Sequence, residues 1–315
     1  MRRIYLSPLD ADGLIELDEV ANGCLVNLVS PTEQEMAEVA ERLSVDLADL
    51  KAPLDVEERS RVSEEEGYVL IVVDIPVPDT SDNAEDYTTI PLGIVLTDEA
   101  IVTTCLEDTP LISDFLSGRV RDFHTYKKTR FVLQLLHRIA GCYLDNLRAI
   151  DTQSVLIERR LHRSMRNKEL IDMLGLEKSL VYFTTSLRSN QRVLDKLLRL
   201  RSIKKYPDDE DLLEDTIEEN RQAMEMAEIY SGVLGSTMDA FASVISNNQN
   251  TVMKMLALIT IIMSIPTMIF SAYGMNVIGE GMPFADSVWG FAIVISIAFV
   301  ISALTTIVFY IKKWF

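Results

Sequence analysis

The residues most able to do chemistry lie near the C-terminus, in an otherwise apolar stretch of the chain. Between positions 250 and 271, small or oxygen-bearing residues recur at spacings of three, four or seven, which puts them on one side of a helix. Such a face could line a weakly polar pore, where hydroxyl groups contact a hydrated ion without trapping it. It could equally be a tight contact between membrane helices, because small and hydroxyl residues are favoured there. We count Leu256 with this face, whose other members are Asn250, Ala257, Thr260, Ser264, Thr267 and Ser271.

Two apolar segments frame these residues. Residues 252–272 contain one charge, Lys254 at the edge, and residues 288–311 contain none. Each is therefore long enough to cross a hydrocarbon core of about 30 Å. Because two helices cannot enclose an aqueous path, a pore along the polar face would need several copies of the chain around an axis.

The charges around the two spans predict their orientation. The loop between them carries Glu280 and Asp286 but no lysine or arginine, whereas Lys312 and Lys313 follow the second span. The positive-inside rule therefore predicts a multi-pass protein of the cell membrane with both termini in the cytoplasm. The start of the chain has no apolar run typical of a secretory signal, which agrees with a cytoplasmic N-terminal part.

The rest of the chain must position the spans. Strand-forming runs such as YVLIVVDIPV, a hairpin turn at Thr97–Ala100 and a helix start with Ser30 as N-cap and Glu33 completing a capping box predict an α/β domain. Long helices follow, and the third would run unbroken from Asp208 into the first span, over roughly 95 Å at 1.5 Å per residue. We thus expect an α+β cytoplasmic domain, then long helices, then two C-terminal transmembrane helices. The expected parts are 1–122 (α/β domain), 123–207 (long helices), 208–272 (stalk helix and first span, the span at about 252–272), 273–287 (outer loop), 288–311 (second span) and 312–315 (basic tail).

A short motif stands at the outer end of the first span. YGMN (Tyr273–Asn276) follows it directly, and SNNQNTVMKML leads into it. In this place the motif resembles the signature of the CorA family of divalent-cation channels, and the resemblance covers the whole chain. It implies a funnel-shaped homopentamer that conducts chiefly Mg²⁺ and tolerates Co²⁺ and Ni²⁺. It also implies that Gly274, Met275 and Asn276 form the selectivity filter.

The chemistry of asparagine suits such a filter. Mg²⁺ gives up its water reluctantly, so a site at a pore mouth should bind the hydrated ion. A ring of Asn276 amide oxygens would accept hydrogen bonds from that water, and neutral amides would release the ion again. Glu280 and Asp286 would enrich cations nearby without coordinating them.

The resemblance also implies regulation. In the CorA family, cytoplasmic Mg²⁺ bound between subunits holds the channel closed. Asp215 lies where we expect one of the paired acids, and Asp79 is a looser match for its partner. The ordinary alternative is that these acids belong to a solvated face and match the dipole of the third long helix.

The composition excludes several classes of function. A formal net charge of −18 argues against a nucleic-acid partner. The cysteines and histidines lack the spacing of a zinc site, and the chain has no Gly-rich phosphate loop or nucleophile elbow, so we expect no enzyme activity. Two alternatives remain: a Zn²⁺ transporter of the same architecture, and a membrane-anchored oligomeric scaffold or sensor whose long helices only form a stalk.

Overall fold

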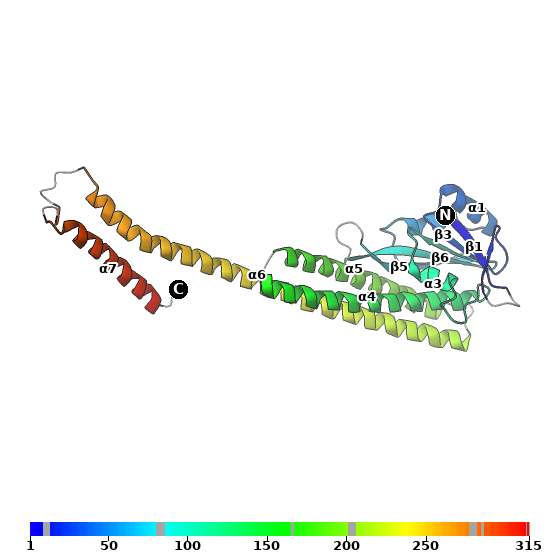
Figure 1. Cartoon of the computed structure of the whole chain (residues 1–315). Coiled ribbons are helices and arrows are strands. Elements are labelled where there is room, and N and C mark those ends of the chain that lie inside the picture. The colour runs from blue at the N-terminus through cyan, green and yellow to red at the C-terminus, as the bar shows by residue number, and fades with distance from the viewer. Residues whose placement is uncertain are drawn as a thin grey trace. The chain divides into compact units, whose positions relative to one another are not determined.

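The computed structural model describes residues 1–8, 13–79, 86–164, 167–200, 206–276, 282–284, 287–312 and 314. These residues fall into two compact units, Met1–Met238 and Asp239–Phe315. Figure 1 shows the elements of both.

The first unit is built on a seven-stranded mixed sheet with strand order β2-β1-β3-β7-β6-β5-β4. β3 and β7 are parallel, and the other neighbouring strands pair antiparallel. The predicted hairpin is confirmed, because the Thr97 N–H donates to the Ala100 carbonyl at 3.0 Å. The strands are β1 (Arg2–Leu6), β2 (Ile15–Leu17), β3 (Leu25–Val29), β4 (Arg61–Glu65), β5 (Tyr68–Pro78), β6 (Tyr87–Thr97) and β7 (Ile101–Cys105).

Short helices cover one face of this sheet. α1 (Glu33–Leu43), α2 (Leu47–Lys51) and the 3-10 turn η1 (Ala52–Leu54) pack on it and bury a core of aliphatic side chains. Pro53 in η1 lies so close to β6 that a β-carbon at Gly93 would come within 3.0 Å of the Pro53 Cβ. The main members of this core are Ile4, Val26, Leu28, Met36, Val39, Leu50, Leu70, Val72, Val95 and Val102.

Two long helices run along the other side of the sheet (Figure 1). α4 (Lys128–Ser164) and α5 (Asn167–Arg199) follow the short α3 (Pro110–Leu116). The Tyr143 hydroxyl donates to the Asp74 carbonyl at 3.0 Å, and Asn190 pairs with both backbone groups of Asp74 at 2.8 and 2.9 Å. Buried side-chain hydrogen bonds of this kind fix α4 and α5 against β5.

The helix α6 (Pro207–Tyr273) is continuous over 67 residues and passes through Pro266. Its first part belongs to the first unit, where Arg130 of α4 pairs with the buried carboxylate of Asp209 at 3.3 Å. Its last part and α7 (Gly290–Ile311) make up the second unit, and both are long and apolar enough to cross a membrane. The predicted architecture of an α/β domain, long helices and two apolar C-terminal helices is therefore confirmed.

The predicted start of the first helix was wrong by two residues. Thr32, not Ser30, is the N-cap of α1, and Glu35, not Glu33, completes the capping box. Ser30 instead adopts a left-handed backbone with φ 41°. The edge strands β2 and β4 were not predicted at all.

Candidate functional site

The polar face of α6 in the second unit is open in the isolated chain. All seven residues assigned to it from the sequence are exposed. On the other side, Leu258 is only 4% exposed, and Ile262, Ile265 and Ile269 are partly buried. These four residues form an apolar stripe, at spacings of four, three and four, that is shielded from solvent. The hydroxyl residues Thr260, Ser264 and Thr267, called the hydroxyl stripe below, are uncovered.

The partner of the shielded stripe is α7. Gly290, Val294 and Ala298 are the buried residues of α7, four positions apart. At one end of the pair, Phe270 and Tyr273 of α6 line the same apolar pocket as Phe291 and Val294 of α7. The two helices of one chain thus meet along one narrow apolar stripe on each, and the hydroxyl stripe of α6 faces away from this contact.

The hydroxyl groups of the stripe have their hydrogens engaged within α6. Thr260 donates to the Leu256 carbonyl at 2.8 Å, Ser264 to Ile261 at 2.8 Å, and Thr267 to Met263 at 2.9 Å. A hydroxyl whose hydrogen is bound to the backbone still offers oxygen lone pairs as acceptors. This face therefore presents acceptor oxygens, which suit the water shell of a cation.

The YGMN motif (Tyr273–Asn276) begins at the last residue of α6 and continues into the exposed segment after it. Met275 and Asn276 are both exposed, and the Gly274 N–H closes the helix on the carbonyls of Phe270 (2.9 Å) and Ser271 (3.2 Å). Gly274 has no positive φ, and within the chain a β-carbon there would make ordinary contacts of 3.4 Å or more with the carbonyl oxygens of Phe270 and Ser271. Glu280 and Asp286 lie outside the described residues.

The two acids assigned to regulation both lie in the first unit. Asp215 is exposed on α6, and Asp79 is half-buried just after β5, with its backbone N–H bound to the Asp86 carbonyl at 2.8 Å. Within the described part of the chain, no three acidic, histidine or cysteine side chains form a group that could hold a metal ion.

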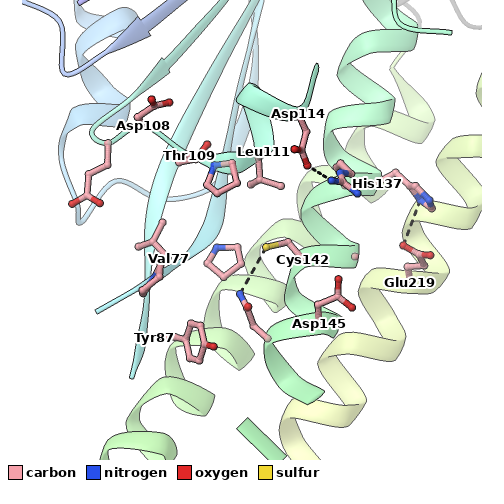
Figure 2. Close-up of a pocket in the computed structure, with 17 residues that line it drawn as sticks. Val77, Tyr87, Asp108, Thr109, Leu111, Asp114, His137, Cys142, Asp145 and Glu219 are labelled. Atoms are coloured by element: carbon pink, nitrogen blue, oxygen red, sulfur yellow. Dashed lines mark hydrogen bonds and ion pairs between the residues drawn. The ribbon is translucent and has the colours of Figure 1, made fainter. Parts of the chain in front are cut away.

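Sequence reasoning missed a cavity of about 430 Å³ in the first unit (Figure 2). The cavity is bounded by four parts of the chain. These are the end of β5, the segment that precedes α3, the helix α4 and the helix α6. Arg138 and Arg119 bind the Asp114 carboxylate, and the His137 Nδ1 lies 3.5 Å from Glu219. Burial disfavours the ionised form of Asp114, but the hydrogen bonds from both arginines outweigh it and lower its pKa. Arg119 is five residues from Asp114, but Arg138 is 24 residues away on α4 and Glu219 lies on α6, so no local pattern predicts the whole cluster.

Comparisons with known proteins match most of the chain. The family model of the CorA-like Mg²⁺ transporter protein matches residues 23–313. The cobalt/magnesium transport protein CorA of Methanocaldococcus jannaschii is 28% identical over 298 residues, which cover 92% of this chain and 90% of that protein. The protein of the same name from Thermotoga maritima is 25% identical over 269 residues, covering 83% and 74%.

The fold is shared with a solved structure. The complete structure of the CorA magnesium transporter from Methanocaldococcus jannaschii superimposes with a TM-score of 0.82 at 24% identity, and the match covers 100% of this chain and 99% of that chain. A family match over residues 23–313 reaches from the α/β domain through both apolar helices. The chain accordingly belongs to the CorA family of Mg²⁺ transporters.

Proposed function

We propose that this protein is a passive channel for divalent cations, chiefly Mg²⁺, with Co²⁺ and Ni²⁺ as tolerated substrates. The observation that carries the proposal is the uncovered hydroxyl stripe of α6, which leads to the exposed Asn276 at the end of the helix. On the other side of the same helix Leu258 is buried and Ile262 and Ile269 are partly buried, whereas most of the remaining apolar residues of the span are exposed like the stripe. A stripe of acceptor oxygens facing a central axis would form the wall of an aqueous path.

Several copies are needed to close that path. Because the described part of one chain supplies two membrane helices, the stripes of neighbouring copies must face each other across a common axis. We propose a homopentamer, as the family resemblance implies, in which α6 lines the pore and α7 lies on the lipid side. Both termini would be cytoplasmic, since lysines flank the cytoplasmic ends of the spans.

The filter would act on the hydrated ion. In each subunit Asn276 would turn its amide oxygen to the water shell of Mg²⁺, whose hexahydrate is costly to strip. Gly274 and Met275 would complete the filter, and Glu280 and Asp286 would raise the local cation concentration. The membrane potential would drive inward flux with about 2.3 kcal/mol per charge per 100 mV, and so about twice that for a divalent ion.

Cytoplasmic Mg²⁺ would also close the channel. Asp79 and Asp215 would meet across a subunit boundary, where carboxylates repel unless a cation lies between them. Bound Mg²⁺ would favour the closed ring by mass action, and its loss would free the subunits to move apart.

The direct test is ion uptake into proteoliposomes that contain the purified full-length protein. Mg²⁺ and Zn²⁺ uptake should be measured with and without an imposed potential, negative inside. We expect Mg²⁺ uptake that increases with the potential and exceeds Zn²⁺ uptake. Zn²⁺ uptake without Mg²⁺ uptake would favour the Zn²⁺ transporter, and no uptake of either ion would favour the scaffold.

A further inference from the structure

Two contacts hold Pro283 and Phe284 against the two membrane helices. The Tyr273 hydroxyl, at the end of α6, donates a hydrogen bond to the Pro283 carbonyl at 2.8 Å. The next residue, Phe284, has a left-handed backbone with φ 64°. Its carbonyl oxygen lies against the α-carbon of Gly290, the first residue of α7. Pro283 and Phe284 are therefore held from α6 on one side and from α7 on the other.

Only glycine fits at position 290 beside the Phe284 backbone. A β-carbon at this position would overlap the Phe284 carbonyl oxygen and lie 3.3 Å from its carbonyl carbon. Because the clash is with backbone atoms, a side chain at 290 would have to displace the Phe284 backbone itself. The absence of a side chain at Gly290 is thus what lets Phe284 reach α7.

The hydrogen bond of Tyr273 lies beside an apolar pocket. A cavity of about 720 Å³ is lined by Phe270, Tyr273, Phe284 and Phe291, with other residues from the two helix ends. The ring of Tyr273 packs at this pocket, while its hydroxyl makes the exposed hydrogen bond to the Pro283 carbonyl. The phenol is therefore a specific tie between Tyr273 and Pro283, beyond the packing of its ring.

We propose that Tyr273 and Gly290 are positioning residues for the ion-selecting asparagine, a role that rests on the proposed function of Asn276 as the filter. Asn276 is three residues after Tyr273 and seven before Pro283, so it lies in the sequence between two residues that are bonded to each other. Anchoring both ends of a segment reduces the conformations open to it. A ring of amides that recognises a hydrated ion by its size needs each amide held to within about 0.5 Å. Tyr273 does not touch the ion and acts only through the place of Asn276.

The test uses Tyr273→Phe, which keeps the ring and removes only the hydroxyl. In proteoliposomes, the Mg²⁺ concentration for half-maximal flux should rise roughly three- to tenfold, as expected for one lost hydrogen bond. The ratio of Mg²⁺ flux to Ca²⁺ flux should fall by a similar factor, while maximal Mg²⁺ flux and the amount of assembled protein stay the same. Tyr310→Phe, which removes a hydroxyl from a 75% exposed tyrosine of α7, is the matched control and should behave as wild type.

A second variant reaches the same segment through different atoms. Gly290→Ala should displace Phe284 and lower the Mg²⁺ to Ca²⁺ flux ratio in the same direction as Tyr273→Phe. Gly232→Ala is its control, because a β-carbon there meets no atom within 4 Å.

The outcomes separate the positioning role from the filter itself, provided that Asn276→Ala is measured alongside. If Asn276→Ala loses Mg²⁺ flux while Tyr273→Phe and Gly290→Ala keep the wild-type ratio, the positioning role is overturned and the filter stands. It is also overturned if both variants lose the flux of both ions in proportion to the amount of assembled protein. If Asn276→Ala keeps wild-type flux and selectivity, the proposed filter fails, and the positioning role fails with it.

Discussion

The carboxyl group of Asp86 lies against the α-carbon of Gly175 in the middle of α5. A β-carbon at position 175 would come within 2.6 Å of the Asp86 Oδ1 and 2.8 Å of its Cγ. The Asp86 carbonyl accepts the N–H of Asp79 at 2.8 Å, and the N–H of Tyr87 donates to Ser179 of α5 at 2.9 Å. Asp86 therefore lies against α5 at Gly175, and its backbone carbonyl in turn holds Asp79.

We predict that Gly175→Ala weakens inhibition by cytoplasmic Mg²⁺. The new methyl group must displace the Asp86 carboxyl group, and the backbone carbonyl of the same residue holds the Asp79 N–H. Inhibition curves in inside-out vesicles should shift to higher Mg²⁺, whereas flux at low cytoplasmic Mg²⁺ should not change. Gly141→Ala on α4 is the control, because a β-carbon there meets no atom within 4 Å. An unchanged inhibition curve for Gly175→Ala would remove Asp79 from the regulatory site.

Asp215→Lys should reduce both Mg²⁺ inhibition and Mg²⁺ protection from protease. The change replaces an exposed carboxylate of α6 with an ammonium group that repels the regulatory ion. Limited proteolysis of the full-length protein in millimolar Mg²⁺ and in chelator gives the readout, and ion selectivity should not change. Asp211→Lys makes the same charge change at an exposed site one turn earlier on α6 and should retain protection. Equal proteolysis of the wild type with Mg²⁺ and with chelator would show that these acids are only a solvated face.

Single cysteines should map the wall of the pore. Cysteine at Thr260, Ser264 or Thr267 should make Mg²⁺ flux sensitive to a hydrophilic thiol reagent, because these exposed positions would face the aqueous path. Cysteine at Ile262 or Ile269 should not, because both positions lie on the partly buried side of α6. The wild type controls for the native thiols, of which Cys24 and Cys105 are buried. Equal sensitivity on both sides would show that the stripe is a packing surface.

Glu35→Gln should destabilise the first unit in a pH-dependent way. The Thr32 N–H donates to the Glu35 carboxylate and, with help from the N-terminal ammonium and against partial burial, lowers its pKa to about 2. A lowered pKa means that the stabilisation is complete above the usual range near 4.5 and is lost as the pH falls towards 2. At pH 7 the loss should be about 0.5–1 kcal/mol, because glutamine can keep the capping-box hydrogen bond but loses the charge that pairs with the N-terminal ammonium.

Thermal unfolding at pH 7 and at pH 3 measures this effect. The difference between wild type and Glu35→Gln should shrink at the lower pH. Glu41→Gln, at an exposed position of the same helix, should have little effect at either pH. A constant difference would mean that the carboxylate charge does not contribute.

Much of the fold was predictable because its signals are local. The central strands β5, β6 and β7 are long apolar runs, and the apolar spans stand out by composition. β2 and β4 were missed because they are the edge strands of the sheet, with mostly exposed or half-buried residues and little hydrophobic pattern. The N-cap of α1 was predicted wrongly because the sequence offers two capping boxes two residues apart, Ser30 with Glu33 and Thr32 with Glu35. The bond of Glu35 to the N-terminus favours the later pair, and it spans 34 residues of sequence.

The residues of the candidate site were predictable from the sequence, but the contacts around them were not. The periodicity of Thr260, Ser264 and Thr267 locates a polar face, and the family motif marks Asn276. The tie between Tyr273 and Pro283 joins residues ten apart across a turn, and no spacing rule predicts such a bond. The seat of Phe284 on Gly290 depends on a positive φ at Phe284, an unusual backbone for a bulky residue.

The central claim is that Asn276 selects the ion, and Mg²⁺ flux through the Asn276→Ala protein tests it most directly. The variant should be purified at full length, shown to assemble and reach the membrane as the wild type does, and reconstituted in proteoliposomes under an imposed potential. We predict that Mg²⁺ flux is nearly abolished, because the alanines that replace Asn276 in each subunit offer no amide oxygens to the water shell of the ion. Wild-type Mg²⁺ flux in the assembled variant would contradict the account.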